Sequence, residues 1–68
     1  MNLDDAINAM REGKKVTHKY LLHTKTKSLR IIGNNYVDEE GYILNNFSVM
    51  MQLKSACFNE GWEIVENN

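Results

Sequence analysis

Apolar residues follow a helical period at the start of the chain and a shorter, alternating period further on. The first apolar positions are spaced i, i+3, i+4 and i+7, as on one face of a helix: Leu3, Ala6, Ile7 and Met10. Asn2 can accept hydrogen bonds from the free amides at the beginning of such a helix, and Gly13 can adopt the left-handed conformation that ends many helices. The pattern therefore predicts a helix over residues 3–12.

After Gly13 the apolar runs become short and rich in β-branched and aromatic residues, which is typical of strands. Clusters of Gly, Asn and Glu at 33–35 and 39–41 indicate turns between them. Residues 20–22 are expected to continue the first strand after a bend, and the polar segment 23–27 is expected to be a loop. The predicted strands are residues 14–18, 28–32, 36–38 and 42–44.

The segment 47–58, FSVMMQLKSACF, fits two periods. Phe47, Val49, Met51 and Leu53 alternate as in a strand, whereas the same segment also contains a helical stripe. Its length favours a helix, with Asn46 as the capping residue, although the strand stays open. The alternation of WEIVE predicts a closing strand over residues 62–66.

These elements together predict one small α+β domain over residues 1–68. An N-terminal helix would pack on a small antiparallel sheet of four meandering strands, followed by a short second helix and a C-terminal strand. The 68-residue chain has no proline to block strand pairing at a sheet edge, and a domain of this size buries a modest core. Both features favour a homo-oligomer.

Charge is separated along the chain although the net charge is only −1. Residues 11–30 hold seven of the eight Lys and Arg side chains, and residues 13–37 contain no Asp or Glu. One interpretation is a site for an anionic partner. The other is a solvated sheet face whose lysines pair with Glu63, Glu66 and the acidic residues 38–40 on neighbouring strands.

Other kinds of site find little support in the sequence. His18 and His23 have no Cys, Asp or Glu beside them to complete a metal site. No nucleophile motif is present and no cofactor is expected. A non-enzymatic protein is therefore predicted. A pI of about 6.0 argues against a dedicated nucleic-acid binder. No apolar run could span a membrane and no secretory signal is evident. A free cysteine also suits the reducing cytoplasm, so a cytoplasmic location is expected. The single Cys57 is interpreted as a buried small hydrophobe.

The two ends of the chain carry a resemblance to a known family. LDDAINAMREGKKVTH at 3–18 and GWEIV at 61–65 resemble small bacteriophage and prophage proteins of the family that includes the second Thoeris anti-defence family. The resemblance implies a small α+β protein that assembles into oligomers in the cytoplasm of the host cell. It also implies sequestration of a cyclic ADP-ribose-type signal made by a bacterial defence enzyme. Where that family commonly has Trp-Asn-Gly after the first strand, this chain has HKYLLHTK.

Three functions follow as hypotheses. The first is an anti-defence protein that sequesters a phosphorylated, cyclic nucleotide signal, with lysines neutralising phosphates and a tyrosine ring stacking on a base. The second is a protein-binding inhibitor of a host enzyme or defence factor, acting through a charged face or an exposed apolar patch. The third is a single-strand nucleic-acid binder. The ligand-binding residues expected for the first are Lys14, Lys15, His18, Lys19 and Tyr20.

Overall fold

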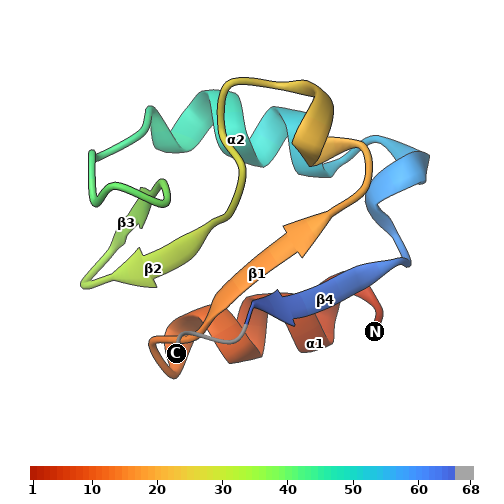
Figure 1. The fold of residues 1–68 in the computed structure, drawn as a ribbon, viewed down its shortest axis with the longest axis horizontal. Helices are drawn as coiled ribbons and strands as arrows, with labels where there is room; N and C mark the ends of the chain where they lie inside the picture. The colour runs from red at the N-terminus through yellow and green to blue at the C-terminus, as the bar shows by residue number, and fades with distance from the viewer. Residues whose placement is uncertain (66–68) are drawn as a thin grey trace.

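The computed structural model describes residues 1–65, apart from the side chain of His23. This part of the chain contains α-helices and antiparallel strands, and the α+β class predicted from the sequence is confirmed (Figure 1). The α-helices and strands are α1 (Leu3–Arg11), β1 (Lys15–His18), β2 (Arg30–Ile32), β3 (Asn35–Val37), α2 (Asn46–Leu53) and β4 (Trp62–Val65). Single turns of 3-10 helix occupy Leu21–His23 (η1) and Ala56–Phe58 (η2).

Helix α1 begins and ends as its sequence predicts. The Asn2 side chain accepts a hydrogen bond of 2.8 Å from the backbone N–H of Asp5. Gly13 has a φ of +90°, and its N–H donates to the Met10 carbonyl while the next residue donates to the Ala9 carbonyl. This pair of bonds is the Schellman motif, which satisfies the last carbonyls of the helix and turns the chain into β1.

The strands form two antiparallel pairs rather than one four-stranded sheet. The neighbours predicted for the meander do meet, since Val16 bridges Leu29, β2 pairs with β3 and Val37 bridges Ile43, but the pairing of β1 with β4 was not predicted. Strand β1 pairs with the closing strand β4, with Val16 opposite Ile64 and His18 opposite Trp62. Strand β2 pairs with β3 through the tight turn at Gly33. On its other edge β1 meets the chain just before β2, where Val16 and Leu29 exchange two backbone hydrogen bonds of 2.8 and 2.9 Å. Strand β1 is therefore central, and the two ends of the chain meet in one sheet.

Two apolar segments predicted as strands have other structures. Residues 42–44 form only a single bridge, between Ile43 and Val37, because the Asp38 carboxylate accepts the N–H groups of Glu40 and Tyr42 and bends the chain. Residues 20–22 do not continue β1 but enter the η1 turn.

The ambiguous segment 47–58 resolves mainly as helix. Helix α2 is capped by Asn45, whose side chain accepts from the N–H of Ser48, and not by Asn46 as predicted. It ends at Leu53 and is followed by η2. Cys57 lies exposed in η2, so its interpretation as a buried residue is wrong. Glu66, the predicted end of the last strand, lies outside the described residues.

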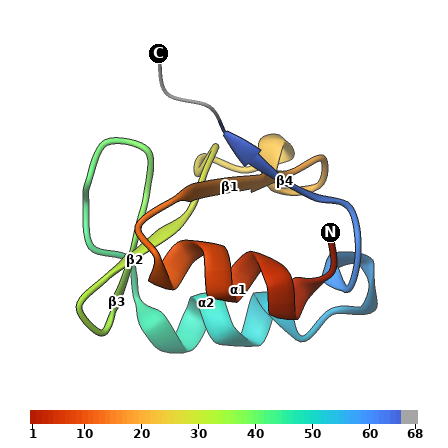
Figure 2. The ribbon, with the colours of Figure 1, turned by 90° about the horizontal axis from the view of Figure 1, so that it is seen from below.

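Both helices lie on the same side of the β1–β4 pair, as Figure 2 shows, and they run in opposite directions. The β2–β3 hairpin lies at the end of this layer where α1 ends and α2 begins (Figure 1). The core fills the space between helices and strands, and its largest fully buried side chains are Trp62, Met10, Leu21, His18 and Val16. This arrangement leaves the hairpin facing the space between the two helices.

Candidate functional site

The residues expected to bind a ligand do not converge on one surface. Lys14 precedes β1 and Lys19 follows it, so the four residues of β1 lie between them and their Cα atoms are about 16 Å apart. Lys15 is half-buried on the face of β1 opposite to the core, where its strand partner is Val65. Lys14 and Lys19 therefore lie at opposite ends of β1.

His18 is a core residue. Its side chain is 1% exposed, and both ring nitrogens are in hydrogen-bond contact with the backbone: Nδ1 accepts from the N–H of Tyr20 at 3.1 Å, and Nε2 lies 2.6 Å from the Glu60 carbonyl. Because Nδ1 accepts, Nε2 is the nitrogen that carries the proton and donates. The ring also packs edge-on against Trp62 with centroids 5.1 Å apart. His18 therefore packs in the core and is not part of an exposed binding surface.

Tyr20 is exposed, but neighbouring groups already contact its ring. The His18 ring stacks on it at 5.4 Å between centroids, and the Lys19 ammonium lies 5.1 Å from its centroid. A base stacking on Tyr20 would have to displace one of these contacts. Tyr20 therefore extends the aromatic cluster of His18 and Trp62 towards the surface.

The alternative interpretation, in which acids on neighbouring strands neutralise the lysines, is also not what the geometry shows. Within residues 1–65 the one ion pair joins Lys14 to Glu12 at 4.0 Å. The Lys27 ammonium instead donates to the carbonyls of Leu22 and Thr24 and so closes the η1 loop. The proposed pairing with Glu66 falls outside the described residues.

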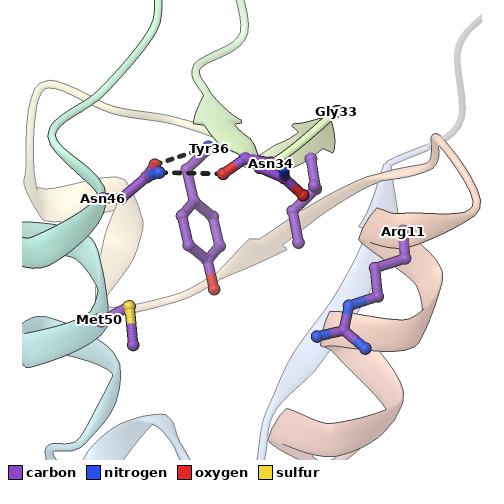
Figure 3. A pocket seen from close by; sticks show the side chains of 7 residues that line it. Arg11, Gly33, Asn34, Tyr36, Asn46 and Met50 are labelled. Carbon is purple, nitrogen blue, oxygen red and sulfur yellow. Dashed lines mark hydrogen bonds between the residues drawn. The ribbon is translucent and has the colours of Figure 1, made fainter.

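A pocket of about 480 Å³ lies beneath the β2–β3 hairpin, between the end of α1 and the beginning of α2 (Figure 3). Its volume falls within the range of small-molecule sites, which is roughly 300–1,000 Å³. Figure 3 shows the Tyr36 ring projecting from the hairpin into this space and Arg11 extending towards it from α1. The lining residues are Arg11, Ile31, Gly33, Asn34, Tyr36, Asn46 and Met50.

Strand alternation decides which hairpin residues reach the pocket. Ile31 and Tyr36 are directly opposite each other in the β2–β3 register and therefore share one face, which is the pocket face. Arg30 and its partner Val37 belong to the other face, so the Arg30 guanidinium does not line the pocket. Arg11 is consequently the cation that the pocket contains.

Asn46 fixes the hairpin to α2. Its side-chain oxygen accepts from the N–H of Tyr36 at 3.0 Å, and its nitrogen donates to the Asn34 carbonyl at 2.9 Å (Figure 3). These two bonds hold the turn and the tyrosine at one position relative to the helix. The polar wall of the pocket is therefore pre-formed.

Variants of the neighbouring residues Asn45 and Asn46 test whether Asn45 caps α2 while Asn46 holds the hairpin. Asn46→Ala should lower the free energy of unfolding by about 2 kcal/mol, because it leaves two backbone groups of the hairpin without their partner. Asn45→Ala removes only a helix cap and should cost about 1 kcal/mol. Urea denaturation gives both values, and amide chemical shifts of residues 33–36 should move only in Asn46→Ala. Equal costs with an unmoved hairpin would contradict this assignment.

The cation that lines this pocket, Arg11, is not among the ligand-binding residues expected from the sequence. Arg11 suits the negative end of the α1 dipole and Tyr36 lies in a short strand, so neither residue stands out in the sequence as a ligand-binding residue. No local pattern links residues 11 and 36, because the hairpin brings them together by folding over the space between the helices. Asn46 did carry a signal, since an extra asparagine beside a helix cap is available for contacts outside the helix.

Other classes of site are not found in the part of the chain that the structure describes. Within it, no group of three His, Cys, Asp or Glu side chains is placed to hold a metal ion. None of its helices has the length and apolar character needed to cross a membrane.

The chain was compared with protein-family models, curated proteins and solved structures, and no match was found. The resemblance of residues 3–18 and 61–65 to the phage family therefore stays a prediction. The structure does assign these residues a shared physical role, because the two segments pair as β1 and β4 and bring His18 against Trp62.

Proposed function

We propose that the protein is a small, non-enzymatic binding protein that sequesters an anionic, nucleotide-type molecule in the pocket beneath the β2–β3 hairpin. The observation that carries the proposal is the placement of Arg11 and Tyr36 on the same pocket. A guanidinium binds phosphate oxygens through two parallel hydrogen bonds, and a tyrosine ring offers a face for a base. This is the chemistry expected from the sequence, at a different set of residues.

The charge of Arg11 is available for such a ligand. Among the described residues, no carboxylate lies within ion-pair distance of its guanidinium and no hydrogen bond occupies it. The side-chain amide of Asn34 and the backbone of the Gly33 turn supply further polar groups around it. Ile31 and Met50 form the apolar part of the pocket wall, as is usual in sites that bind an aromatic ring.

The ligand class can be narrowed by the size of the pocket and by the sequence. A volume of about 480 Å³ suits a mononucleotide or a compact cyclic nucleotide. The resemblance at 3–18 and 61–65 implies a cyclic ADP-ribose-type signal and, with it, an anti-defence role in a bacteriophage. Such molecules therefore belong in the test panel beside AMP, ADP and inorganic pyrophosphate.

Calorimetric titration with this panel tests the proposal. Arg11→Gln should weaken binding of the best ligand by about 10- to 100-fold, which corresponds to the loss of one charged hydrogen-bonding group. Tyr36→Leu keeps an apolar wall and should weaken binding of nucleotides but not of pyrophosphate. Lys25→Gln, which removes an exposed charge outside the pocket, is the matched control and should bind as the unchanged protein does.

The double variant Lys14→Glu, Lys15→Glu separates this site from the basic segment. If the pocket is the site, the double variant should retain most of its affinity, with a modest electrostatic loss that added salt removes. If it abolishes binding while Arg11→Gln does not, the ligand binds at the segment predicted from the sequence, and the pocket proposal is wrong.

A further inference from the structure

Two rows of side chains line the space between helices α1 and α2. Residues four positions apart lie on one face of a helix. The helices run in opposite directions (Figure 2), so the end of α1 lies beside the beginning of α2, at the hairpin. Arg11 and Asn46 mark this polar end, and the rest of each row leads away from the hairpin. The row on α1 is Leu3, Ile7 and Arg11, and the row on α2 and its C-cap is Asn46, Met50 and Lys54.

A second cavity continues from the pocket along these rows. It is a groove of about 290 Å³ between the helices (the helix groove). Tyr36 and Met50 line both the pocket and the helix groove, so the two cavities adjoin at these residues. Figure 3 shows Tyr36 between the helix that carries Met50 and the helix that carries Arg11. The other residues that line the helix groove are Leu3, Ile7, Leu53, Lys54 and Asn59.

The helix groove is suited to an aliphatic group and not to a second base or sugar. Leu3, Ile7 and Leu53 give it walls without hydrogen-bonding groups in their side chains. The polar edges of a base or a ribose would lose their water there without gaining partners, which costs free energy. A saturated carbon chain has no such groups, and its burial against these side chains is favourable.

We propose that the ligand of the pocket is a phosphate ester that carries an aliphatic chain, with the phosphate at Arg11 and the chain in the helix groove. The inference rests on the proposed anion site and adds the chain to it. Its support is the continuity of the two cavities past Tyr36 and Met50. The helix groove alone is at the lower limit of small-molecule sites, roughly 300 Å³, so it acts as an extension of the pocket.

The length of the groove limits the length of the chain. Leu3 and Arg11 are eight positions apart in α1, which places their Cα atoms about 12 Å apart. An extended carbon chain advances about 1.25 Å per bond, so about nine carbons span this distance. At the far end Asn59 lines the groove, and its carbonyl accepts from the N–H of Leu3 at 2.9 Å. Affinity should therefore rise with chain length and then level off.

NMR titrations with methyl, butyl, octyl and decyl phosphate, each below its micelle concentration, test the inference. Full burial of a CH₂ group strengthens binding about fourfold, and the helix groove is open on one side, where Met50 is 52% exposed. We therefore expect about twofold for each CH₂, or roughly 100-fold between methyl and octyl phosphate. Decyl phosphate should bind less than about twofold more tightly than octyl phosphate, because the chain has reached the end of the groove.

Variants separate the chain from the phosphate. Ile7 lines the helix groove and not the pocket, so Ile7→Ser should weaken octyl phosphate at least fivefold and leave methyl phosphate unchanged. Arg11→Gln should weaken both ligands. Ile64→Ser removes an exposed apolar side chain of β4, away from both cavities, and should change neither affinity. Circular dichroism checks that each variant is folded.

A second measurement needs no variant. In the complex with octyl phosphate, intermolecular NOEs should connect the alkyl chain with the methyl groups of Leu3 and Ile7. Equal affinities for methyl and octyl phosphate, or a complex without these NOEs, overturn the inference and leave phosphate binding at Arg11 untouched. Titrations in which no alkyl phosphate and no nucleotide shifts the Arg11 amide overturn the anion site itself.

The octyl ester of AMP distinguishes the two sources of such a ligand. If this ester binds more tightly than octyl phosphate, the base contributes and the ligand is a nucleotide with an aliphatic chain. If the two bind equally, the ligand is a lipid-type phosphate. That result would support the chain in the helix groove and contradict the nucleotide part of the proposed function.

Discussion

Replacing Trp62 by alanine should remove a large part of the protein's stability. The side chain is 1% exposed, packs against His18 and Phe58, and donates from Nε1 to the Phe58 carbonyl at 2.6 Å. Removing a buried tryptophan typically costs about 3–5 kcal/mol. A domain of this length has about 3–10 kcal/mol of stability in total, so the change removes a large part of it.

Urea denaturation followed by circular dichroism measures this effect. Ile64→Ala is the matched control in the same strand: Ile64 is partly exposed and its truncation should cost less than about 1.5 kcal/mol. A Trp62→Ala protein whose midpoint stays close to that of Ile64→Ala would show that the cluster around His18 does not hold the two ends of the chain together.

Gly61→Ala should be the most destabilising glycine substitution. Gly61 has a φ of +93°, which strains any residue with a side chain, and a Cβ there would lie 3.1 Å from Nε2 of His18. The ring cannot move away without breaking its backbone contacts with Tyr20 and Glu60. Backbone strain and overpacking together should cost about 2–4 kcal/mol.

Gly41 provides the control for backbone strain alone. It has a φ of +87°, but nothing lies within 4 Å of the position that its Cβ would take. Gly41→Ala should therefore cost only about 1–2 kcal/mol. Comparison of the two thermal unfolding curves isolates the contact with His18, and equal losses of stability would mean that the contact contributes nothing.

Features set by neighbouring residues were predicted well from the sequence. Asn2 and Gly13 mark the two ends of α1, and both act through bonds to residues within five positions of themselves. The pairing of β2 with β3 was predicted, but the pairing of β1 with β4 was not, because these two strands are more than 40 residues apart. Nothing in either strand alone specifies that choice. It follows from the packing of His18 on Trp62 and from the close approach of Gly61.

The candidate site shows the same contrast between features set by neighbouring residues and features set by the tertiary structure. The basic segment is conspicuous because its charges are adjacent in sequence, but an extended strand spreads them and turns His18 inward. Arg11 and Tyr36 are inconspicuous, and the fold brings them to one pocket. We propose the same chemistry, a cation with an aromatic ring, at residues that only the tertiary structure brings together.

Amide chemical-shift mapping during titration with the nucleotide panel tests the central claim most directly, since the chain is small enough for complete assignment. A ligand in the pocket should shift the amides of Arg11, Gly33, Asn34, Tyr36 and Asn46 together, with one saturating dependence on concentration. Shifts confined to residues 14–20, or no shifts with any member of the panel, would contradict a nucleotide site beneath the hairpin.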